Sequence, residues 1–262
     1  GRRVGLCAPL GGALAAALGM VPLVWVASLA KRDASIGDVF WSLGSVVAGW
    51  IYFLTAEART TRGVLVVVLV TLWGLRLSLY ILWRNWGHGE DYRYREMRER
   101  HSRSFALWSL VVVFWFQAVL LWVISAPLFP AQRPAPASLT ALDVLGILLV
   151  AVGFAFEAGG DWQLARFKAD SANKGKVMSR GFWRYTRHPN YFGDAVVWWG
   201  LFCFAAATGG WWTVYGPVLM TFLLMRVSGV ALLEKRLRET KPAYRDYVER
   251  TNAFFPWFPA PG

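Results

Sequence analysis

Charged residues are scarce in this chain of 262 residues. Only 17% of the residues are charged and 56% are hydrophobic, whereas soluble domains carry about 25% charged residues. The chain is therefore short of the polar surface that a soluble domain needs, and the same numbers exclude intrinsic disorder, collagen, a coiled coil and a disulfide scaffold. Cysteine is equally rare, since Cys7 and Cys203 are the two present. Both lie in apolar stretches, so neither a disulfide framework nor a cysteine-ligated metal cluster is indicated. We expect an integral membrane protein.

Long apolar runs occupy most of the sequence. A helix needs about 20 mostly apolar residues to cross a bilayer, because its backbone polar groups must be satisfied within the segment. We predict an all-α, polytopic membrane protein with seven transmembrane helices in a single domain, residues 1–262. The predicted spans are residues 8–30, 36–56, 63–83, 105–129, 140–160, 191–208 and 211–233. The Gly/Ala-rich run from Gly11 to Gly19 favours close helix packing.

The positive charge is distributed unevenly between the ends of the predicted spans. The connections 31–35, 84–104 and 161–190, together with the tail 234–262, hold 21 of the 28 basic residues, and the opposite side holds 5. Because Lys and Arg collect on the cytoplasmic side, the N-terminus is expected outside and the C-terminus in the cytoplasm. This distribution explains the net charge of +12 without a nucleic-acid partner.

The cytoplasmic connections 84–104 and 161–190 mix basic residues, aromatic residues and glycine. Such a surface suits an anionic, planar ligand. The alternative is a solvated loop that interacts with anionic lipid head groups. No Gly-x-Gly-x-x-Gly run is present, so a Rossmann domain is not expected, and His88 and His101 lack partners at metal-ligand spacing. No metal site is predicted.

Several ionisable residues fall within the predicted spans or at their cytoplasmic ends. Each is costly in lipid, so it usually faces a cavity or a partner. An ion pair between Asp38 and Arg76 with a purely structural role is one interpretation. The full set is Asp38, Arg76, Glu157, Asp161, Asp194, Arg226 and Glu234.

The run Arg184-Tyr-Thr-Arg187-His-Pro-Asn190 has the features of a phosphate site. Pro189 disfavours a helical conformation at His188, so a helix is expected to start near Asn190. A helix N-terminus carries free N–H groups and partial positive charge. The guanidinium groups of Arg184 and Arg187 suit phosphate oxygens. The alternative is a tight turn whose Arg and His face lipid phosphates.

The segment from Gly181 to Asp194, which continues into Trp198-Trp-Gly200, resembles the signature of the membrane steroid 5α-reductase family, and more narrowly its bacterial DUF1295-type branch. The resemblance extends over most of the chain. It includes Asp38-Val-Phe-Trp41, Leu72-Trp-Gly-Leu-Arg-Leu77, Gly87-His-Gly-Glu-Asp-Tyr-Arg-Tyr94, Glu234-Lys-Arg-Leu237 and Asn252-Ala-Phe-Phe-Pro256.

The resemblance implies NADPH-dependent reduction of a C=C bond conjugated to a ketone, as in a Δ4-3-oxosteroid. Asp38 falls near a family Glu that holds the keto oxygen, and Trp73 stands near the family Tyr. An indole donates a hydrogen bond but does not readily supply a proton, so Tyr80 is the fallback donor. The implied cofactor residues are Asp91, Tyr92, Arg93, Asp161, Lys168, Tyr185, Arg187, His188, Asn190, Asp194 and Glu234. Candidate substrate residues are Trp41, Trp50, Phe53 and Arg76.

The resulting expectation is a monomer in the bacterial inner membrane that takes a steroid-like enone from the bilayer and NADPH from the cytoplasm. Two other functions stay open. Membrane methyltransferases of the isoprenylcysteine or phospholipid type share the Arg-His-Pro run and a late acidic residue. They usually have Glu-Glu where this chain has Glu234-Lys235. The protein could also be a non-catalytic membrane component that binds lipid.

Overall fold

The computed structural model describes residues 7–134, 138–227 and 229–260. Across these residues the regular secondary structure is helical and contains no strand, so the prediction of an all-helical chain is confirmed. Five of the described helical stretches are long and apolar enough to cross a membrane: Ala8–Lys31, Ile36–Leu54, Thr61–Asn85, Tyr92–Ile124 and Ala141–Ala169. Each overlaps one of the first five predicted spans, although Tyr92–Ile124 begins well before residue 105 and Ala141–Ala169 extends beyond residue 160. Together they indicate a membrane protein.

Helical residues also occupy the predicted sixth and seventh spans. Helix α9 (Pro189–Ala207) covers the sixth. The seventh is divided into α10 (Tyr215–Phe222) and the π-helix η6 (Leu223–Val227). Neither is among the five stretches that are long and apolar enough. Seven spans and the orientation of the termini stay predictions.

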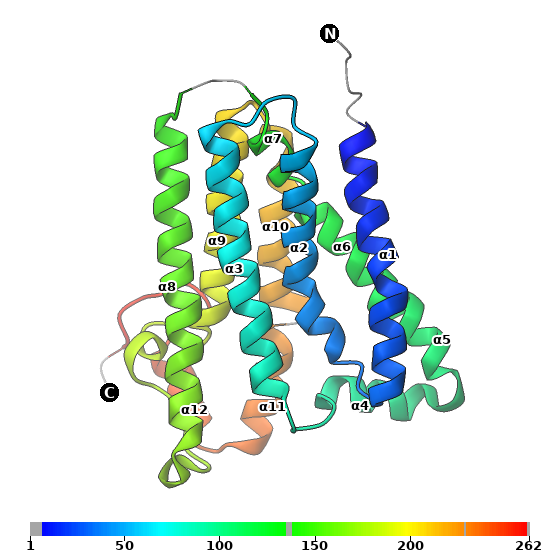
Figure 1. Ribbon diagram of the computed structural model, residues 1–262. Coiled ribbons are helices and arrows are strands. Elements are labelled where there is room, and N and C mark those ends of the chain that lie inside the picture. The colour runs from blue at the N-terminus through cyan, green and yellow to red at the C-terminus, as the bar shows by residue number, and fades with distance from the viewer. Residues whose placement is uncertain (1–6, 135–137, 228, 261–262) are drawn as a thin grey trace. The chain divides into compact units, whose positions relative to one another are not determined.

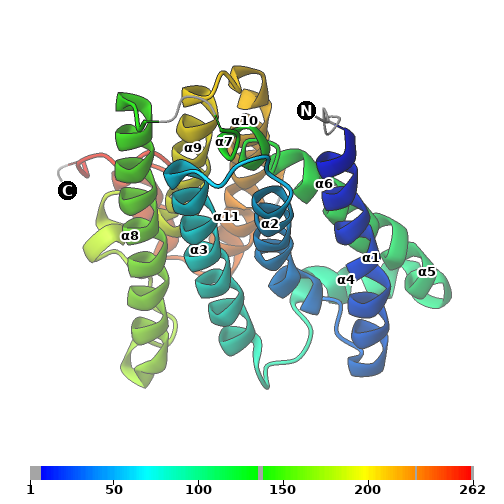
Figure 2. The ribbon, with the colours of Figure 1, turned by 45° about the horizontal axis from the view of Figure 1, so that its top comes forward.

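The chain folds into two compact units, residues 1–140 with 204–213 and residues 141–203 with 214–262. In the first unit, α1, α2 and α3 run side by side (Figures 1 and 2). The helical elements of this unit up to residue 131 are α1 (Cys7–Lys31), α2 (Ile36–Leu54), α3 (Thr61–Asn85), α4 (Tyr92–His101), η1 (Ser102–Ser104), α5 (Phe105–Ser109), the π-helix η2 (Leu110–Trp115), α6 (Phe116–Ile124) and α7 (Leu128–Ala131).

Small residues let α2 and α3 approach closely. A Cβ atom on Gly74 would lie 2.5 Å from Val46 Cγ2 and 2.9 Å from the Ser42 carbonyl oxygen. The hydroxyl oxygens of Ser42 and Ser78 are hydrogen-bonded at 2.6 Å. Close backbone approach and hydroxyl pairing are typical of helices that associate in lipid. The α2–α3 pair therefore forms a rigid support for residues at the start of α2.

The Gly/Ala-rich run of α1 packs on one side only. Ala13 and Ala17 are buried, and a Cβ atom on Gly12 would lie 3.7 Å from Ile51 Cγ2 of α2. A Cβ atom on Gly11 or Gly19 would meet nothing within 4 Å, and both glycines are exposed. The run therefore packs through its alanines and Gly12 rather than through the two glycines at its ends.

The second unit is built on α8 (Ala141–Ala169) and the part of α9 up to Cys203. A Cβ on Gly193 would lie 2.4 Å from the Glu157 nitrogen and the Gly153 carbonyl oxygen, and one on Gly200 would lie 2.8 Å from the Gly146 oxygen. The two backbones are thus in direct contact. The unit also contains η3 (Ser171–Asn173), η4 (Gly181–Arg184), α10, η6, α11 (Val230–Thr240) and α12 (Tyr244–Arg250).

The chain after α12 runs back along the residues that precede α9. Arg187 N donates to the Asn252 carbonyl at 2.8 Å, and Trp257 N donates to the Tyr185 carbonyl at 2.9 Å. Thr186 Oγ1 donates to the Phe254 carbonyl at 2.9 Å. This pairing places the C-terminal segment directly against the Arg-His-Pro run.

Candidate functional site

Asp38, in the first turn of α2, is the centre of a polar cluster in the first unit. Its Oδ2 accepts from Arg93 Nη2 at 2.8 Å, and its Oδ1 accepts from the Tyr94 hydroxyl at 2.5 Å. Gln117 Nε2 donates to the Tyr94 hydroxyl oxygen at 3.3 Å. The structure therefore does not pair Asp38 with Arg76, whose guanidinium lies over the Tyr80 ring at 5.2 Å from its centroid.

The loop before α4 brings Arg93 and Tyr94 to Asp38. Asp91 caps the helix, because its Oδ1 accepts from Arg93 N at 3.0 Å and also from Arg93 Nε at 3.0 Å. Glu90 accepts from Ala34 N at 2.8 Å and forms an ion pair with Arg98 at 2.7 Å. These contacts explain why residues 92–101, predicted as part of a connecting loop, form a helix.

Two residues predicted to bind the cofactor, Asp91 and Arg93, are thus engaged within the first unit. Tyr92 lies beside them and is partly buried. Burial raises the pKa of the Glu90 carboxyl, but hydrogen bonds from Arg98 and Ala34 outweigh it, so the pKa is lowered. Glu90 is accordingly a carboxylate at neutral pH that fastens α4 to the α1–α2 connection.

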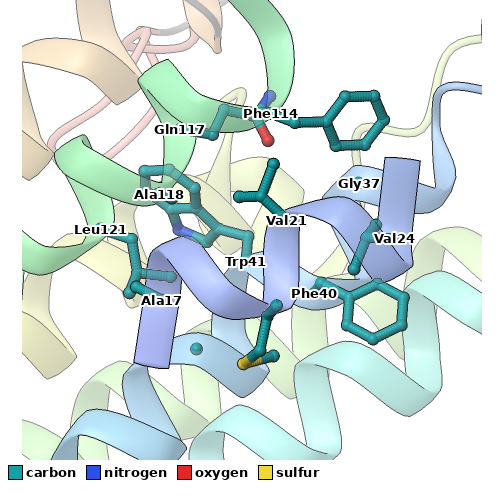
Figure 3. Close-up of a pocket in the computed structure, with 12 residues that line it drawn as sticks. Ala17, Val21, Val24, Gly37, Phe40, Trp41, Phe114, Gln117, Ala118 and Leu121 are labelled. Atoms are coloured by element: carbon teal, nitrogen blue, oxygen red, sulfur yellow. The ribbon is translucent and has the colours of Figure 1, made fainter. Parts of the chain in front are cut away.

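An apolar pocket lies between α1, α2 and the η2–α6 segment (Figure 3). It holds about 420 Å³, including its open mouth. Val21, Phe40 and Phe114 are among its walls, and Gln117 supplies an amide to the lining. The same amide donates to Tyr94. A hydrophobic pocket with a polar group at its wall is the usual form of a small-molecule site.

Trp41 lines this pocket, whereas the other predicted substrate residues do not. Trp50 and Phe53 follow Asp38 by 12 and 15 residues on the same helix, so they lie about 18 Å or more away along its axis. Trp50 Nε1 donates to Thr71 Oγ1 at 3.1 Å. Arg76 is on α3 beside Tyr80.

The predicted donors Trp73 and Tyr80 are both on α3. Trp73 is fully buried. The Tyr80 ring lies between two guanidiniums, with the centroid 5.2 Å from Arg76 and 5.8 Å from Arg84. The aromatic residue that donates a hydrogen bond to Asp38 is Tyr94, through its hydroxyl, rather than Trp73 or Tyr80.

Arg187 is the most extensively bonded residue of the Arg-His-Pro run. Its Nη2 lies 2.6 Å from Glu234 Oε1, and its Nε donates to the same oxygen at 2.8 Å. Its Nη1 donates to the carbonyl oxygens of Thr251 and Val248. A guanidinium with these partners holds α11 and the C-terminal segment. The predicted phosphate contact by Arg187 would require these bonds to break.

His188 is buried, with 1% of its surface exposed. Burial lowers the pKa of its imidazole; the Glu234 carboxylate opposes this shift, but the net pKa is lowered. The neutral ring then donates from Nε2 to Glu234 Oε1 at 3.2 Å, which leaves Nδ1 as an acceptor. Nδ1 has no hydrogen-bond partner within the described residues. Buried acceptors are normally paired, so this atom indicates a ligand or an ordered water.

Asn190 lies in the first turn of α9, which begins at Pro189 as the sequence predicts. Its Nδ2 donates to Asp161 Oδ1 at 3.1 Å. Asp161 and Asp194 are buried, while Lys168 and Tyr185 are exposed. In the part of the chain that the structure describes, no three His, Cys, Asp or Glu residues are placed to hold a metal ion.

Several site residues were not assigned from the sequence. Tyr94 was noted as the end of a motif, but its contact with Asp38 depends on the path of the chain before α4. Gln117 carries no local signal, because it is one polar residue in an apolar run. Tyr247, whose hydroxyl donates to the Trp183 carbonyl, lies in a region predicted only as a cytoplasmic tail.

The family model described as a protein of unknown function, DUF1295, matches residues 24–251. This range covers well over half of the chain. It includes both the cluster around Asp38 and the contacts of Arg187 and His188 with Glu234. The chain belongs to the DUF1295 family. DUF1295 proteins are related to membrane proteins of the steroid 5α-reductase type, which agrees at this level with the predicted resemblance.

A similar protein occurs in a fungus. The DUF1295 chain is 24% identical over 263 residues to the uncharacterized protein C594.04c of Schizosaccharomyces pombe (strain 972 / ATCC 24843). The aligned region covers 89% of this chain and 76% of the yeast protein. No solved structure matches significantly.

Proposed function

We propose that this protein is an NADPH-dependent reductase that saturates the C=C bond of an enone lipid, of the Δ4-3-oxosteroid type, to the 5α-dihydro product. One observation carries the proposal: the apolar pocket has in its wall an amide that is hydrogen-bonded through Tyr94 to Asp38. A hydrophobic ketone needs this combination, because its skeleton requires apolar walls and its oxygen requires a donor.

Gln117 is the proposed donor to the keto oxygen. An amide nitrogen carries two N–H groups, and one of them is used in the bond to Tyr94. The second is available for an oxygen in the pocket. Polarisation of the ketone draws electron density from the conjugated C=C bond and makes its β-carbon electrophilic. Asp38 and Tyr94 fix the orientation of the amide that performs this role.

The reaction adds a hydride to the β-carbon and a proton to the α-carbon, and the C=C π bond breaks. NADPH, when bound, supplies the hydride and is thereby oxidised. The proton source that we assign is the Tyr94 hydroxyl. Arg93 donates to Asp38 Oδ2 and so fixes the carboxylate that accepts from the Tyr94 hydroxyl. For proton transfer, this O–H turns from Asp38 to the α-carbon of the substrate.

The second unit carries the residues proposed for the cofactor. His188 Nδ1 is a buried acceptor without a protein partner among the described residues, which fits a donor such as a carboxamide or a ribose hydroxyl. Asn190 and Asp161 lie at the start of α9. Lys168 and Arg184 are exposed cations that suit phosphates. Tyr185, Asp194 and Glu234 complete the proposed set.

Binding of S-adenosylmethionine by a methyltransferase is the second candidate. The observation that favours it is the bond between His188 and Glu234, which joins the Arg-His-Pro run to the late acidic residue shared with such enzymes. The first candidate is preferred because the pocket and the Asp38–Tyr94 pair suit a ketone. We further propose a monomer in the bacterial inner membrane, with the proposed cofactor residues on its cytoplasmic side and no nucleic-acid partner.

The test is NADPH consumption by detergent-purified protein with progesterone or testosterone. Tyr94→Phe removes the hydroxyl proposed as proton donor, so we expect turnover to fall by about 10²-fold, the usual contribution of a general acid. Asp38→Ala and Asn190→Ala are expected to abolish it. The matched control is Glu99→Gln, an exposed residue of α4, which should leave the rate unchanged.

A second pair of variants tests the pocket itself. Ala17 lines the pocket, whereas Ala15 on the same helix is exposed. Ala17→Phe should therefore raise the KM for the steroid, and Ala15→Phe should not. Equal turnover in the wild type, Tyr94→Phe and Ala17→Phe would contradict the assignment of this pocket.

A further inference from the structure

An exposed aromatic surface lies on the segment that follows α12. The exposed fractions of Phe255, Trp257 and Phe258 are 62%, 69% and 78%, and neighbouring Tyr185 is also exposed. Phe254 in the same segment is buried. Several large apolar side chains side by side on a surface indicate an interaction site.

The backbone of this segment is held in place, so the exposure does not arise from a loose end. Thr186 Oγ1 donates to the carbonyls of Ala253 and Phe254 at 3.2 and 2.9 Å. Trp257 N donates to Tyr185, and Ala260 N donates to the Arg250 carbonyl at 3.0 Å. The aromatic rings are therefore presented outward by a structured segment.

The C-terminal segment 252–260 lies beside α8 (Figures 1 and 2). It lies near the end of the part of α8 that is expected in the hydrocarbon core of the bilayer. The Phe192 ring contacts Phe156 of α8, with centroids 5.2 Å apart, and Phe255, with centroids 6.3 Å apart. Trp183 Nε1 donates to the Gly160 carbonyl of α8 at 3.0 Å. About 20 helical residues cross a hydrocarbon core of about 30 Å, so a span that begins near Ala141 leaves the core close to Asp161.

Beside this segment, α8 has an exposed apolar side of the kind that suits lipid. Val144, Leu148 and Val152 are exposed apolar residues of this helix, and Trp162 is 58% exposed. At 3.6 residues per turn these four side chains fall within a sector of about 80°. Arg166 lies over the Trp162 ring at 5.0 Å from its centroid. Trp and Tyr at this depth are typical of the boundary between hydrocarbon and head groups.

An exposed cation is attached to the same segment. The Arg250 carbonyl accepts from Ala260 N at 3.0 Å, and the Arg250 side chain is exposed. A guanidinium on a segment with an interfacial aromatic surface suits the phosphates of anionic lipids.

We propose that residues 252–260, together with Trp162, form an aromatic anchor that inserts into the head-group boundary of one leaflet, with Arg250 at the level of anionic lipid phosphates. This proposal does not depend on the reaction proposed above. Its partner is the lipid surface, because the anchor lies beside a helix that has an exposed apolar side suited to lipid.

The test uses the full chain in nanodiscs of phosphatidylcholine and phosphatidylglycerol, with Cys7 and Cys203 replaced by alanine. A nitroxide is attached through Phe258→Cys. The matched control is Ser171→Cys, an exposed position just beyond the end of α8. Collision rates with oxygen, which concentrates in lipid, and with a water-soluble nickel chelate are measured by power-saturation electron paramagnetic resonance.

We expect the ratio of oxygen to nickel collision rates to be several-fold higher at position 258 than at position 171. Equal ratios would place the segment in water and overturn the proposal. Low collision rates with both reagents at position 258 would show that another protein surface covers it, which would also overturn the proposal. Phe258 is exposed, so its replacement is not expected to disturb folding, and an unchanged melting temperature checks this.

Discussion

Replacement of Glu234 by glutamine is expected to destabilise the protein by about 3–5 kcal/mol, the usual cost of leaving a buried charge without its partner. The charge left behind is that of Arg187, whose side chain is 7% exposed and which lies 2.6 Å from Glu234. The carbonyls of Val248 and Thr251 would still accept from it but carry no charge. The apparent melting temperature in detergent measures the effect.

The control is Glu239→Gln. Glu239 lies on the same helix, α11, and is exposed, so the change should stay within about 0.5 kcal/mol. A double variant, Arg187→Met with Glu234→Leu, should be less destabilised than Glu234→Gln, since it leaves no unpaired charge. A melting temperature for Glu234→Gln equal to that of Glu239→Gln would show that the buried pair does not hold the tail.

The stability that the Arg187–Glu234 pair contributes depends on pH. Burial raises the pKa of Glu234, but hydrogen bonds from His188 and Arg187 outweigh it and lower the pKa from 4.5 to about 2. A lowered carboxyl pKa gives stability that is complete above about pH 4.5 and is lost as the pH falls toward 2. The pKa of His188 is lowered, chiefly by burial, so His188 costs stability below its ordinary pKa of 6.5. Glu234→Gln should remove the loss of folding stability that the wild type shows between pH 4.5 and 2.

A methyl group added at Gly193 is the second change with a large expected effect. Its Cβ would lie 2.4 Å from the Glu157 nitrogen and the Gly153 carbonyl oxygen. Both are backbone atoms of α8, so the clash is relieved only if α8 and α9 move apart. Overpacking costs about 1–3 kcal/mol and occasionally more, and we expect Gly193→Ala to lie at or above the top of this range.

The matched control is Gly19→Ala. A Cβ on Gly19 of α1 meets nothing within 4 Å, so alanine should stabilise the helix by about 0.5–1 kcal/mol through its higher propensity. The two identical substitutions are thus predicted to change the melting temperature in opposite directions. A melting temperature for Gly193→Ala at or above that of the wild type would contradict the close contact between α8 and α9.

The sequence predicts where the helical spans lie better than it predicts which residues of neighbouring helices they pack against. Hydropathy locates five helices that are long and apolar enough to cross a membrane, because such a span must satisfy its backbone within itself. It does not identify the neighbour of a small residue, so the close contacts fall at Gly74 and Gly193 rather than at Gly11 and Gly19. The change from α-helical to π-helical hydrogen bonding between α10 and η6 is also not visible in a continuous apolar run.

Side-chain roles in the site are predictable only in part. The sequence identifies Asp38 as an ionisable residue within a predicted span, where it needs a partner, and it identifies His188 and Asn190 through the Arg-His-Pro run. It does not reveal that Arg187 is bonded to Glu234 and to the carbonyls of the C-terminal segment. That role depends on residues more than 40 positions away, and a guanidinium suits a carboxylate as well as a phosphate.

The central claim is that the second unit binds NADPH, and the melting temperature of the purified protein during titration with nucleotides tests it most directly. A ligand at 100 times its Kd stabilises the folded state by about 2.7 kcal/mol. We predict that NADPH raises the melting temperature, that NADH does so less, and that Asn190→Ala abolishes the shift. Stabilisation by S-adenosylmethionine and not by NADPH would contradict the reductase and favour the methyltransferase. Stabilisation by neither would contradict both.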